Sequence, residues 1–243
     1  MTHRFVFLHG FTQTHHHWHR PAAAIATEMG GDPMLAFVDL PGHGLAADDR
    51  AGIADAAAPL AELAGPGTWV GYSMGGRFAL HAALAPGTPV ERLVLIGVTA
   101  GLADPAERSA RVADDGARAT ALEADGLDAF LVRWLAAPLF ATLAPDPAGL
   151  EHRRRNTVAG LAHSLRTAGT GTQVSLWPRL AEIDVPVLVL AGELDAKFTA
   201  LGQQLAAALP HAEFASVTGA GHAAHTERPT EVAHLVSSWL SRF

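Results

Sequence analysis

Three residues of this sequence have the types and the chain order of a proton-transfer unit. Ser73 lies in a Gly-Tyr-Ser-Met-Gly-Gly phrase, and Asp195 and His222 each follow a glycine-containing turn further along the chain. A serine hydroxyl reacts when a histidine can take its proton, and that imidazole needs a carboxylate to hold its tautomer. The order serine, acid, histidine is typical of sites built at the strand ends of a parallel sheet. We therefore predict a Ser73–His222–Asp195 triad.

The serine phrase also predicts the local structure that would present the hydroxyl. Small residues at Gly71 and Gly75 allow a tight turn from a strand into a helix, which we expect over 77–84. Such a turn places Ser73 at the carboxyl end of the sheet.

Each acid and base has a plainer interpretation. Asp195 could cap a helix, and His222 is one of 14 histidines. Glu193 is an alternative acid and His225 an alternative base, but both lie a few residues from the preferred positions. The agreement of three phrases in the expected order favours the triad.

A negative charge that develops on a substrate oxygen needs backbone N–H donors. Phe11, in the turn after the first predicted strand, and Met74, after the serine, are predicted to supply them. We expect His9 to shape this turn rather than to react.

The elements that must position these residues alternate between short aliphatic runs and Ala/Leu-rich helical segments. Strands are expected at 4–8, 35–38, 69–71, 93–96, 187–190 and 213–217. This alternation predicts an α/β fold with about six parallel strands and helices on both faces. The rhythm stops between 96 and 187, where charged helical sequence such as 107–123 predicts a helical cap, with a helix break at 145–147. We divide the chain into core residues 1–99, cap residues 100–180 and core residues 181–243.

Composition excludes several classes of protein. A chain of 243 residues with 49% hydrophobic residues can bury one large core. Its formal net charge of −7 argues against nucleic-acid binding, and no apolar run reaches the about 18 residues of a membrane span. The first residues lead directly into a strand without the pattern of a signal peptide, so we expect a cytoplasmic protein.

At this point the motifs resemble a family within the α/β hydrolases, the 2-succinyl-6-hydroxy-2,4-cyclohexadiene-1-carboxylate synthases of menaquinone biosynthesis. The resemblance covers nearly the whole chain. It rests on phrases at 8–11, 39–44, 71–77, 192–198 and 221–229, and on cap phrases at 107–111, 133–140 and 161–177.

The resemblance implies an elimination rather than a hydrolysis, with no cofactor and no metal. The triad would remove a proton next to the succinyl ketone, the oxyanion hole would hold the enolate, and pyruvate would leave. A small substrate with several carboxylates would be bound by arginines, because guanidinium groups bind carboxylates through two hydrogen bonds. The expected substrate-binding residues are Arg77, one helical turn after Ser73, together with Arg111, Arg108, Arg166, Tyr72 and Trp134.

Other functions stay open at this stage. A serine esterase, or a hydrolase of carbon–carbon bonds, would use the same triad. A dehalogenase is disfavoured because it would carry aspartate at position 73. A non-catalytic binding module is disfavoured by the complete set of catalytic residue types.

Two features depart from the family pattern. The antiparallel hairpin that usually precedes the first strand is absent from the sequence, so a sheet edge could be bare, and a homo-oligomer that covers it is one expectation. The second feature is the histidine-rich segment 13–19. Consecutive histidines do not share a helical face, so we expect no metal site there, and we expect Trp18 to pack at the mouth of the cap.

Overall fold

Short aliphatic runs bounded by glycine, proline or aspartate form the strands of one parallel sheet. The computed structural model describes residues 3–243, except for the side chains of Pro147 and Ala148. Within these residues the sheet has six strands in the order β2-β1-β3-β4-β5-β6, all parallel. Their bounds are β1 Arg4–Leu8, β2 Met34–Val38, β3 Gly67–Tyr72, β4 Val90–Ile96, β5 Val187–Gly192 and β6 Ala212–Val217. This confirms the predicted α/β-hydrolase fold.

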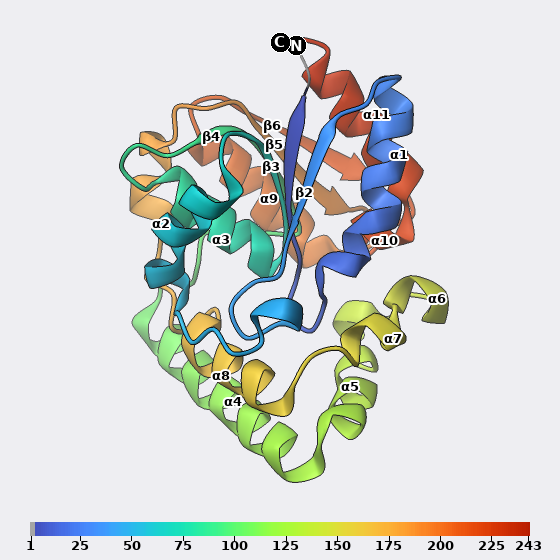
Figure 1. The fold of residues 1–243 in the computed structure, drawn as a ribbon. Helices are drawn as coiled ribbons and strands as arrows, with labels where there is room; N and C mark the ends of the chain where they lie inside the picture. Colours follow the sequence, from blue (N-terminus) through green and yellow to red (C-terminus); the bar gives the residue numbers. More distant parts are fainter. Residues whose placement is uncertain (1–2) are drawn as a thin grey trace.

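Helices cover both faces of the sheet (Figure 1). On one face lie α1 (His19–Met29) and α11 (Pro229–Leu240), and on the other lie α2 (Ile53–Ala64), α3 (Met74–Ala83) and α9 (Ala196–Ala208). Shorter elements connect them: η1 His15–Trp18, η2 Gly44–Ala46, η3 Pro138–Phe140, η4 Trp177–Glu182 and α10 Ala224–Glu227. Because both faces are covered, the strands are apolar on both sides.

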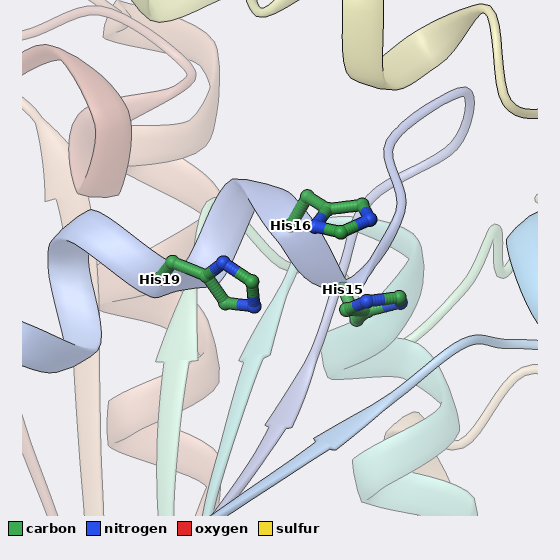
Figure 2. A group of neighbouring side chains, drawn as sticks. All are labelled: His15, His16 and His19. Atoms are coloured by element: carbon green, nitrogen blue, oxygen red, sulfur yellow. The ribbon is translucent and has the colours of Figure 1, made fainter.

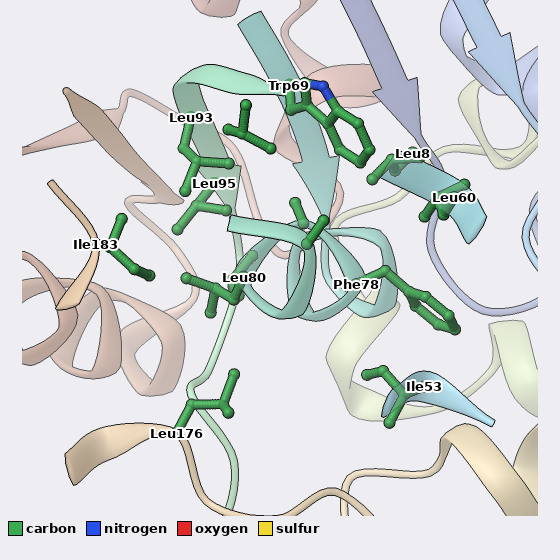
Figure 3. Packing of buried hydrophobic residues seen from close by; sticks show 14 of the residues in the cluster. Leu8, Ile53, Leu60, Trp69, Phe78, Leu80, Leu93, Leu95, Leu176 and Ile183 are labelled. Carbon is green, nitrogen blue, oxygen red and sulfur yellow. The ribbon is translucent and has the colours of Figure 1, made fainter. Parts of the chain in front are cut away.

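The face that carries α3 holds the cluster drawn in Figure 3. Phe78 and Leu80 of α3 are fully buried in it together with Trp69 and Leu93 of the sheet. This packing fixes the helix that follows Ser73, which begins at Met74, three residues earlier than expected. Leu176 also packs in this cluster, so the chain returns from the cap to the core before η4.

The segment between β4 and β5 forms a layer of helices at the carboxyl ends of the strands, in green and yellow in Figure 1. Its α-helices are α4 Pro105–Asp125, α5 Leu127–Leu135, α6 Pro145–Ala148, α7 Leu150–Arg153 and α8 Val158–Ala168. Its own apolar cluster includes Leu122, Phe130 and Leu161. Asp104 caps α4 by accepting a hydrogen bond from the Ala106 N–H. The expected break at 145–147 is wrong, because a short helix forms there with proline in its first turn, where proline is tolerated.

Trp18 departs from the expectation for it. The indole is fully buried in the cluster between the sheet and α1, with its ring centroid 5.1 Å from that of Phe7 and 4.5 Å from that of His225. It therefore packs in the core rather than at the cap mouth, because η1 turns its side chain toward the sheet.

The edges of the sheet are β2 and β6. Nothing in the described chain tests whether a partner covers either edge, so self-association stays a prediction. No helix among residues 3–243 has both the length and the apolar character needed to span a membrane.

Two buried histidines act as structural acceptors beside the first turn. His9 accepts a hydrogen bond from the Leu40 N–H at Nε2 and donates from Nδ1 to the Gly10 carbonyl. His43 accepts from the Thr12 N–H at Nε2 and donates from Nδ1 to the Pro41 carbonyl. Protonation would place a second ring N–H against a backbone donor. Burial lowers the pKa of His9 to about 4 and that of His43 to about 3. Both rings therefore stay neutral at neutral pH.

His225 also has a lowered pKa, but its surroundings differ from those of His9 and His43. Its ring is fully buried between Trp18 and Tyr72, and within residues 3–243 neither ring nitrogen has a hydrogen-bond partner. Burial lowers its pKa well below the usual value.

These three histidines predict an acid-sensitive fold. Their folded-state pKa values lie below the unfolded value, so the stability is fully present above about pH 6.5 and is lost as the pH falls toward the folded values. Each proton that such a histidine takes up on unfolding contributes about 1.4 kcal/mol per pH unit to the slope below about pH 6. Urea unfolding measured from pH 7 to pH 4.5 tests this.

A matched pair of variants assigns the effect. His225→Phe should reduce the slope of unfolding free energy against pH by about 1.4 kcal/mol per pH unit, because one proton taken up on unfolding is removed. His211→Gln, at an exposed histidine, should keep the full slope. A free energy of unfolding that does not change between pH 6.5 and pH 5 would contradict the prediction.

Candidate active site

Ser73 occupies a strained turn between β3 and α3. It has φ 50° and ψ −108°, a conformation that a residue with a side chain adopts at a cost. The flanking glycines make the turn possible: a Cβ on Gly71 would lie 2.5 Å from Gly76 Cα, and one on Gly75 would lie 2.2 Å from the Leu8 carbonyl oxygen. The sequence folds this way because only hydrogen atoms fit at those two positions. Ser73 is thereby placed at the N-terminus of α3.

The structure brings Ser73, His222 and Asp195 into one hydrogen-bonded chain. The Ser73 hydroxyl lies 3.3 Å from His222 Nε2, and His222 Nδ1 lies 2.8 Å from Asp195 Oδ2. Because the carboxylate accepts from Nδ1–H, Nε2 is the nitrogen that can accept the serine proton. The arrangement can therefore move a proton from Ser73 to His222.

Asp195 both caps a helix and contacts the imidazole of His222, the two roles that the sequence allowed. Its Oδ1 accepts a hydrogen bond from the Phe198 N–H and caps α9, while its Oδ2 holds His222. Capping and orientation of the imidazole are compatible because a carboxylate has two oxygens.

The alternative acid and base occupy other positions. Glu193 accepts a hydrogen bond from the Gly219 N–H, and His225 lies behind Tyr72 with its ring centroid 4.2 Å from that of the tyrosine. Neither is hydrogen-bonded to Ser73 or His222.

Phe11 and Met74, whose backbone N–H groups are the predicted donors, both line the cavity together with Ser73. Met74 is the first residue of α3, so its N–H is at the positive end of the helix dipole. The Phe11 ring packs edge-on against Trp134 of the cap, at 5.1 Å between centroids, and against His43 at 5.6 Å. The cap and the core thus hold the first turn from both sides.

A cavity of about 320 Å³ opens over Ser73, between the sheet and the cap. Ser73, His222, Tyr72 and Trp134 all line it. Among its lining residues one carboxylate, Asp115, faces five cationic side chains: Arg77, Arg111, Arg118, Arg153 and Lys197. The cleft is therefore electropositive in a protein of net charge −7.

Arg77 is buried at the floor of this cavity, with 6% of its surface exposed. It donates hydrogen bonds to the Gln173 Oε1 atom at 3.1 Å and to the Ala168 carbonyl oxygen at 2.7 Å, both of which are uncharged. Burial lowers the pKa of Arg77 to about 10, so the guanidinium stays charged at neutral pH. A buried cation with neutral partners is costly until an anion binds beside it.

Arg111 and Arg118 enter the cavity from α4. Arg111 Nε donates to both oxygens of Asp115, at 2.9 and 2.8 Å, and Arg118 lies 3.5 Å from the same carboxylate. Burial raises the pKa of Asp115, and its charge offsets part of the charge of the two arginines.

Arg153 is one of three cavity-lining cations that the sequence did not predict; the other two are Arg118 and Lys197. It is 1% exposed and donates a hydrogen bond to the Thr12 hydroxyl, and burial lowers its pKa to about 10. Its neighbour Arg154 is exposed and paired with Asp128 and Glu151. In a run of three arginines, only the orientation of the short helix α7 selects which one points inward.

Two expected arginines are not part of the cavity lining. Arg166 is exposed and forms a two-bond ion pair with Glu123, at 2.5 and 2.7 Å. Arg108 donates to the carbonyl oxygens of Leu102 and Ala103 near the start of α4. Both are therefore removed from the set of substrate-binding candidates, whereas Tyr72, Trp134, Arg77 and Arg111 stay in it.

Comparison with known proteins agrees with this geometry. Residues 5–235 match the model of the alpha/beta hydrolase family. The chain is 36% identical to the 2-succinyl-6-hydroxy-2,4-cyclohexadiene-1-carboxylate synthase of Klebsiella pneumoniae (strain 342) over 246 residues, which is 97% of this chain and 93% of that protein. The structure of MenH from S. aureus superposes with a TM-score of 0.89 at 30% identity, covering 100% of this chain and 95% of that one.

A more distant likeness shows the fold alone. The structure of a thermophilic esterase from Thermogutta terrifontis superposes with a TM-score of 0.76 at 21% identity, over 100% of this chain and 90% of that chain. By its sequence and its fold together, the chain is an enzyme of the α/β-hydrolase family and belongs, within it, to the 2-succinyl-6-hydroxy-2,4-cyclohexadiene-1-carboxylate synthases.

Proposed function

We propose that this enzyme is a carbon–oxygen lyase of menaquinone biosynthesis, which eliminates pyruvate to form 2-succinyl-6-hydroxy-2,4-cyclohexadiene-1-carboxylate. The observation that carries the proposal is the pairing of a Ser73–His222–Asp195 chain with a cavity that is lined by five cations and one carboxylate. A substrate with several carboxylates matches that charge, and a neutral substrate does not.

The triad acts as a base in this proposal. Asp195 keeps the proton of His222 on Nδ1, His222 Nε2 takes the Ser73 proton, and the serine oxygen removes the proton next to the succinyl ketone. The electrons of that C–H bond move into an enolate, whose oxygen is stabilised by the N–H groups of Phe11 and Met74. When the enolate collapses, a ring double bond forms and the carbon–oxygen bond breaks with its electron pair on the leaving oxygen. The leaving group takes up a proton from the Ser73–His222 pair and is released as pyruvate, which restores the pair for the next turnover. The reaction consists of proton transfers and an elimination, so it needs no redox cofactor.

The cations position the substrate for this step. Arg77, at the cavity floor, keeps donor capacity for a carboxylate, and each charge-assisted hydrogen bond is worth about 1.5–3 kcal/mol. Arg111 and Arg118 from α4 and Arg153 from α7 extend the positive charge across the cap side of the cavity. The cap therefore contributes binding, while the core contributes the base.

A serine esterase is the alternative with the same triad. Esterases share this fold, as the Thermogutta terrifontis structure shows, so the fold does not separate the two reactions. The charge of the cavity does, because a small neutral ester gains nothing from a buried guanidinium.

The first prediction concerns the triad. Ser73→Ala and His222→Ala should each lower the kcat of pyruvate release by at least about a thousandfold, because each breaks the same proton-transfer unit. The double variant should be little worse than either single variant. Losses that simply add in free energy would contradict the proposal that the two residues act together, and circular dichroism of each variant checks that the fold is retained.

The second prediction separates the synthase from the esterase through Arg77. Arg77→Ala should lower kcat/KM for the synthase reaction about ten- to a hundredfold, at roughly 1.4 kcal/mol per decade. Arg77→Lys should recover part of this loss, because it restores the charge without the two-bond geometry. The matched control is Arg166→Ala, an arginine paired with Glu123 outside the cavity, which should stay within about twofold of the wild type.

A neutral aryl acetate measured on the same variants completes the test. We expect little turnover of that ester and little effect of Arg77→Ala on it. The synthase proposal is wrong if the wild type releases no pyruvate while it cleaves the ester rapidly and Arg77→Ala leaves that cleavage unchanged.

A further inference from the structure

A group of three histidines lies where α1 begins, outside the cavity described above. His15 and His16 belong to η1, and His19 is the first residue of α1. One ring nitrogen of each lies within 4.8 Å of those of the other two. The ring centroids are 4.0 Å apart for His15 and His16, 5.1 Å for His16 and His19, and 5.7 Å for His15 and His19. Figure 2 shows the three rings on one side of the helix start. We call them the histidine cluster.

The ring nitrogens of these histidines lie close together, contrary to the expectation from their spacing, because of a tertiary contact. Asp39, in the loop after β2, accepts a hydrogen bond from His15 Nδ1 at 2.7 Å and another from the His15 backbone N–H at 2.7 Å. These two bonds fix the His15 ring against its neighbour His16. His16 and His19 are three residues apart, which places them on one side of a helical turn.

Asp39 also fixes the tautomer of His15 that a metal ligand needs. The carboxylate is buried, with 3% of its side chain exposed, and is held in place by the Leu45 N–H at 2.9 Å. Because His15 donates its Nδ1 proton to Asp39, its Nε2 carries the free lone pair. Metal-binding histidines commonly donate the other ring N–H to a carboxylate, which orients the ring and makes the ligand more basic.

The other two rings are available to a ligand. His16 is partly buried and His19 is exposed, and within the described chain neither side chain forms a hydrogen bond. Imidazole nitrogen is a ligand for zinc, copper and nickel, whereas magnesium and calcium prefer oxygen. The chemistry of the cluster therefore points to the first class of ion.

We propose that His15, His16 and His19 bind one divalent transition-metal ion, with Asp39 as the carboxylate that orients His15. Zinc–nitrogen bonds of about 2.0–2.1 Å hold three nitrogens closer together than the 4.8 Å within which these lie of one another. Rotation of the partly exposed side chains of His16 and His19 supplies that movement without any change in the backbone. Water would complete the coordination.

The position of the cluster suggests what the ion would do. His152, from the cap helix α7, stacks on His16 with a centroid distance of 4.8 Å and an interplanar angle of 20°. The same Asp39 carboxylate lies 3.5 Å from Nε2 of His9, which shapes the oxyanion turn. An ion on the cluster would therefore lie at the junction between the core and the cap, and it would raise the melting temperature by binding the folded state.

Zinc titration of the purified chain, freed of any polyhistidine tag and dialysed against a chelator, tests the proposal. Isothermal titration calorimetry at pH 7.5 should show one zinc ion per chain, and magnesium should give no saturable heat. His16→Ala and His19→Ala should each weaken zinc binding by at least about tenfold. The melting temperature of the wild type should rise with zinc, and that of the two variants should not.

The matched control is His211→Ala, because His211 is an exposed histidine beside a carboxylate, Asp184, at 3.1 Å. It should bind zinc as the wild type does. Cobalt supplies a second readout, since visible absorption bands from bound Co²⁺ should appear with the wild type and His211→Ala and be lost with His16→Ala.

Two outcomes would overturn the proposal. One is the absence of saturable zinc binding up to about 1 mM. The other is binding that has the same affinity in His16→Ala, His19→Ala and the wild type, which would place the ion elsewhere. Neither measurement uses catalysis, so the result is independent of the proposed reaction.

Discussion

The site depends on the close approach of the start of α3 to the end of β1. A Cβ at Gly75 would lie 2.2 Å from the Leu8 carbonyl oxygen, so the two elements meet only because that residue is glycine. This contact brings the turn that carries Ser73 beside the turn that carries Phe11. Serine and both proposed oxyanion donors are thereby positioned by strand ends and a helix start rather than by flexible loops. The strain at Ser73 is held by the packing of α3 against the sheet.

The second constraint on the structure is electrostatic: cationic side chains are concentrated in the lining of the cavity. Arg77 is almost completely buried and donates to uncharged acceptors, an unfavourable arrangement for a guanidinium. Neutral acceptors such as the Ala168 carbonyl oxygen keep Arg77 in place when no substrate is bound. In the proposed function, a substrate with several carboxylates would offset the unfavourable energy of concentrating cations there. The same residues thus lower the stability of the fold and raise its affinity for an anion, which is common in binding sites.

Histidine takes four different roles in this chain, and the surroundings select each role. His222, between a carboxylate and a serine, is arranged as a base. His43 and His9 are neutral acceptors for backbone N–H groups. His225 is buried as an aromatic ring between Trp18 and Tyr72. The histidine cluster is at the surface, where imidazoles can meet an ion. Composition alone, with 14 histidines, does not separate these roles.

The sequence by itself determined the fold class, the six parallel strands and the three residues that meet in one hydrogen-bonded chain, because these depend on local patterns. A strand followed by glycine and serine can form only a few turns, and the carboxyl ends of parallel strands meet at one edge. Tertiary structure alone decided which arginines face the cavity, because Arg153 differs from Arg154 only in the orientation of a four-residue helix. It also decided the burial of Trp18 and the convergence of the histidine cluster, whose orientation depends on Asp39, a residue 24 positions away. Side-chain direction is set by contacts between distant segments, and the spacing of residues along the chain does not contain them.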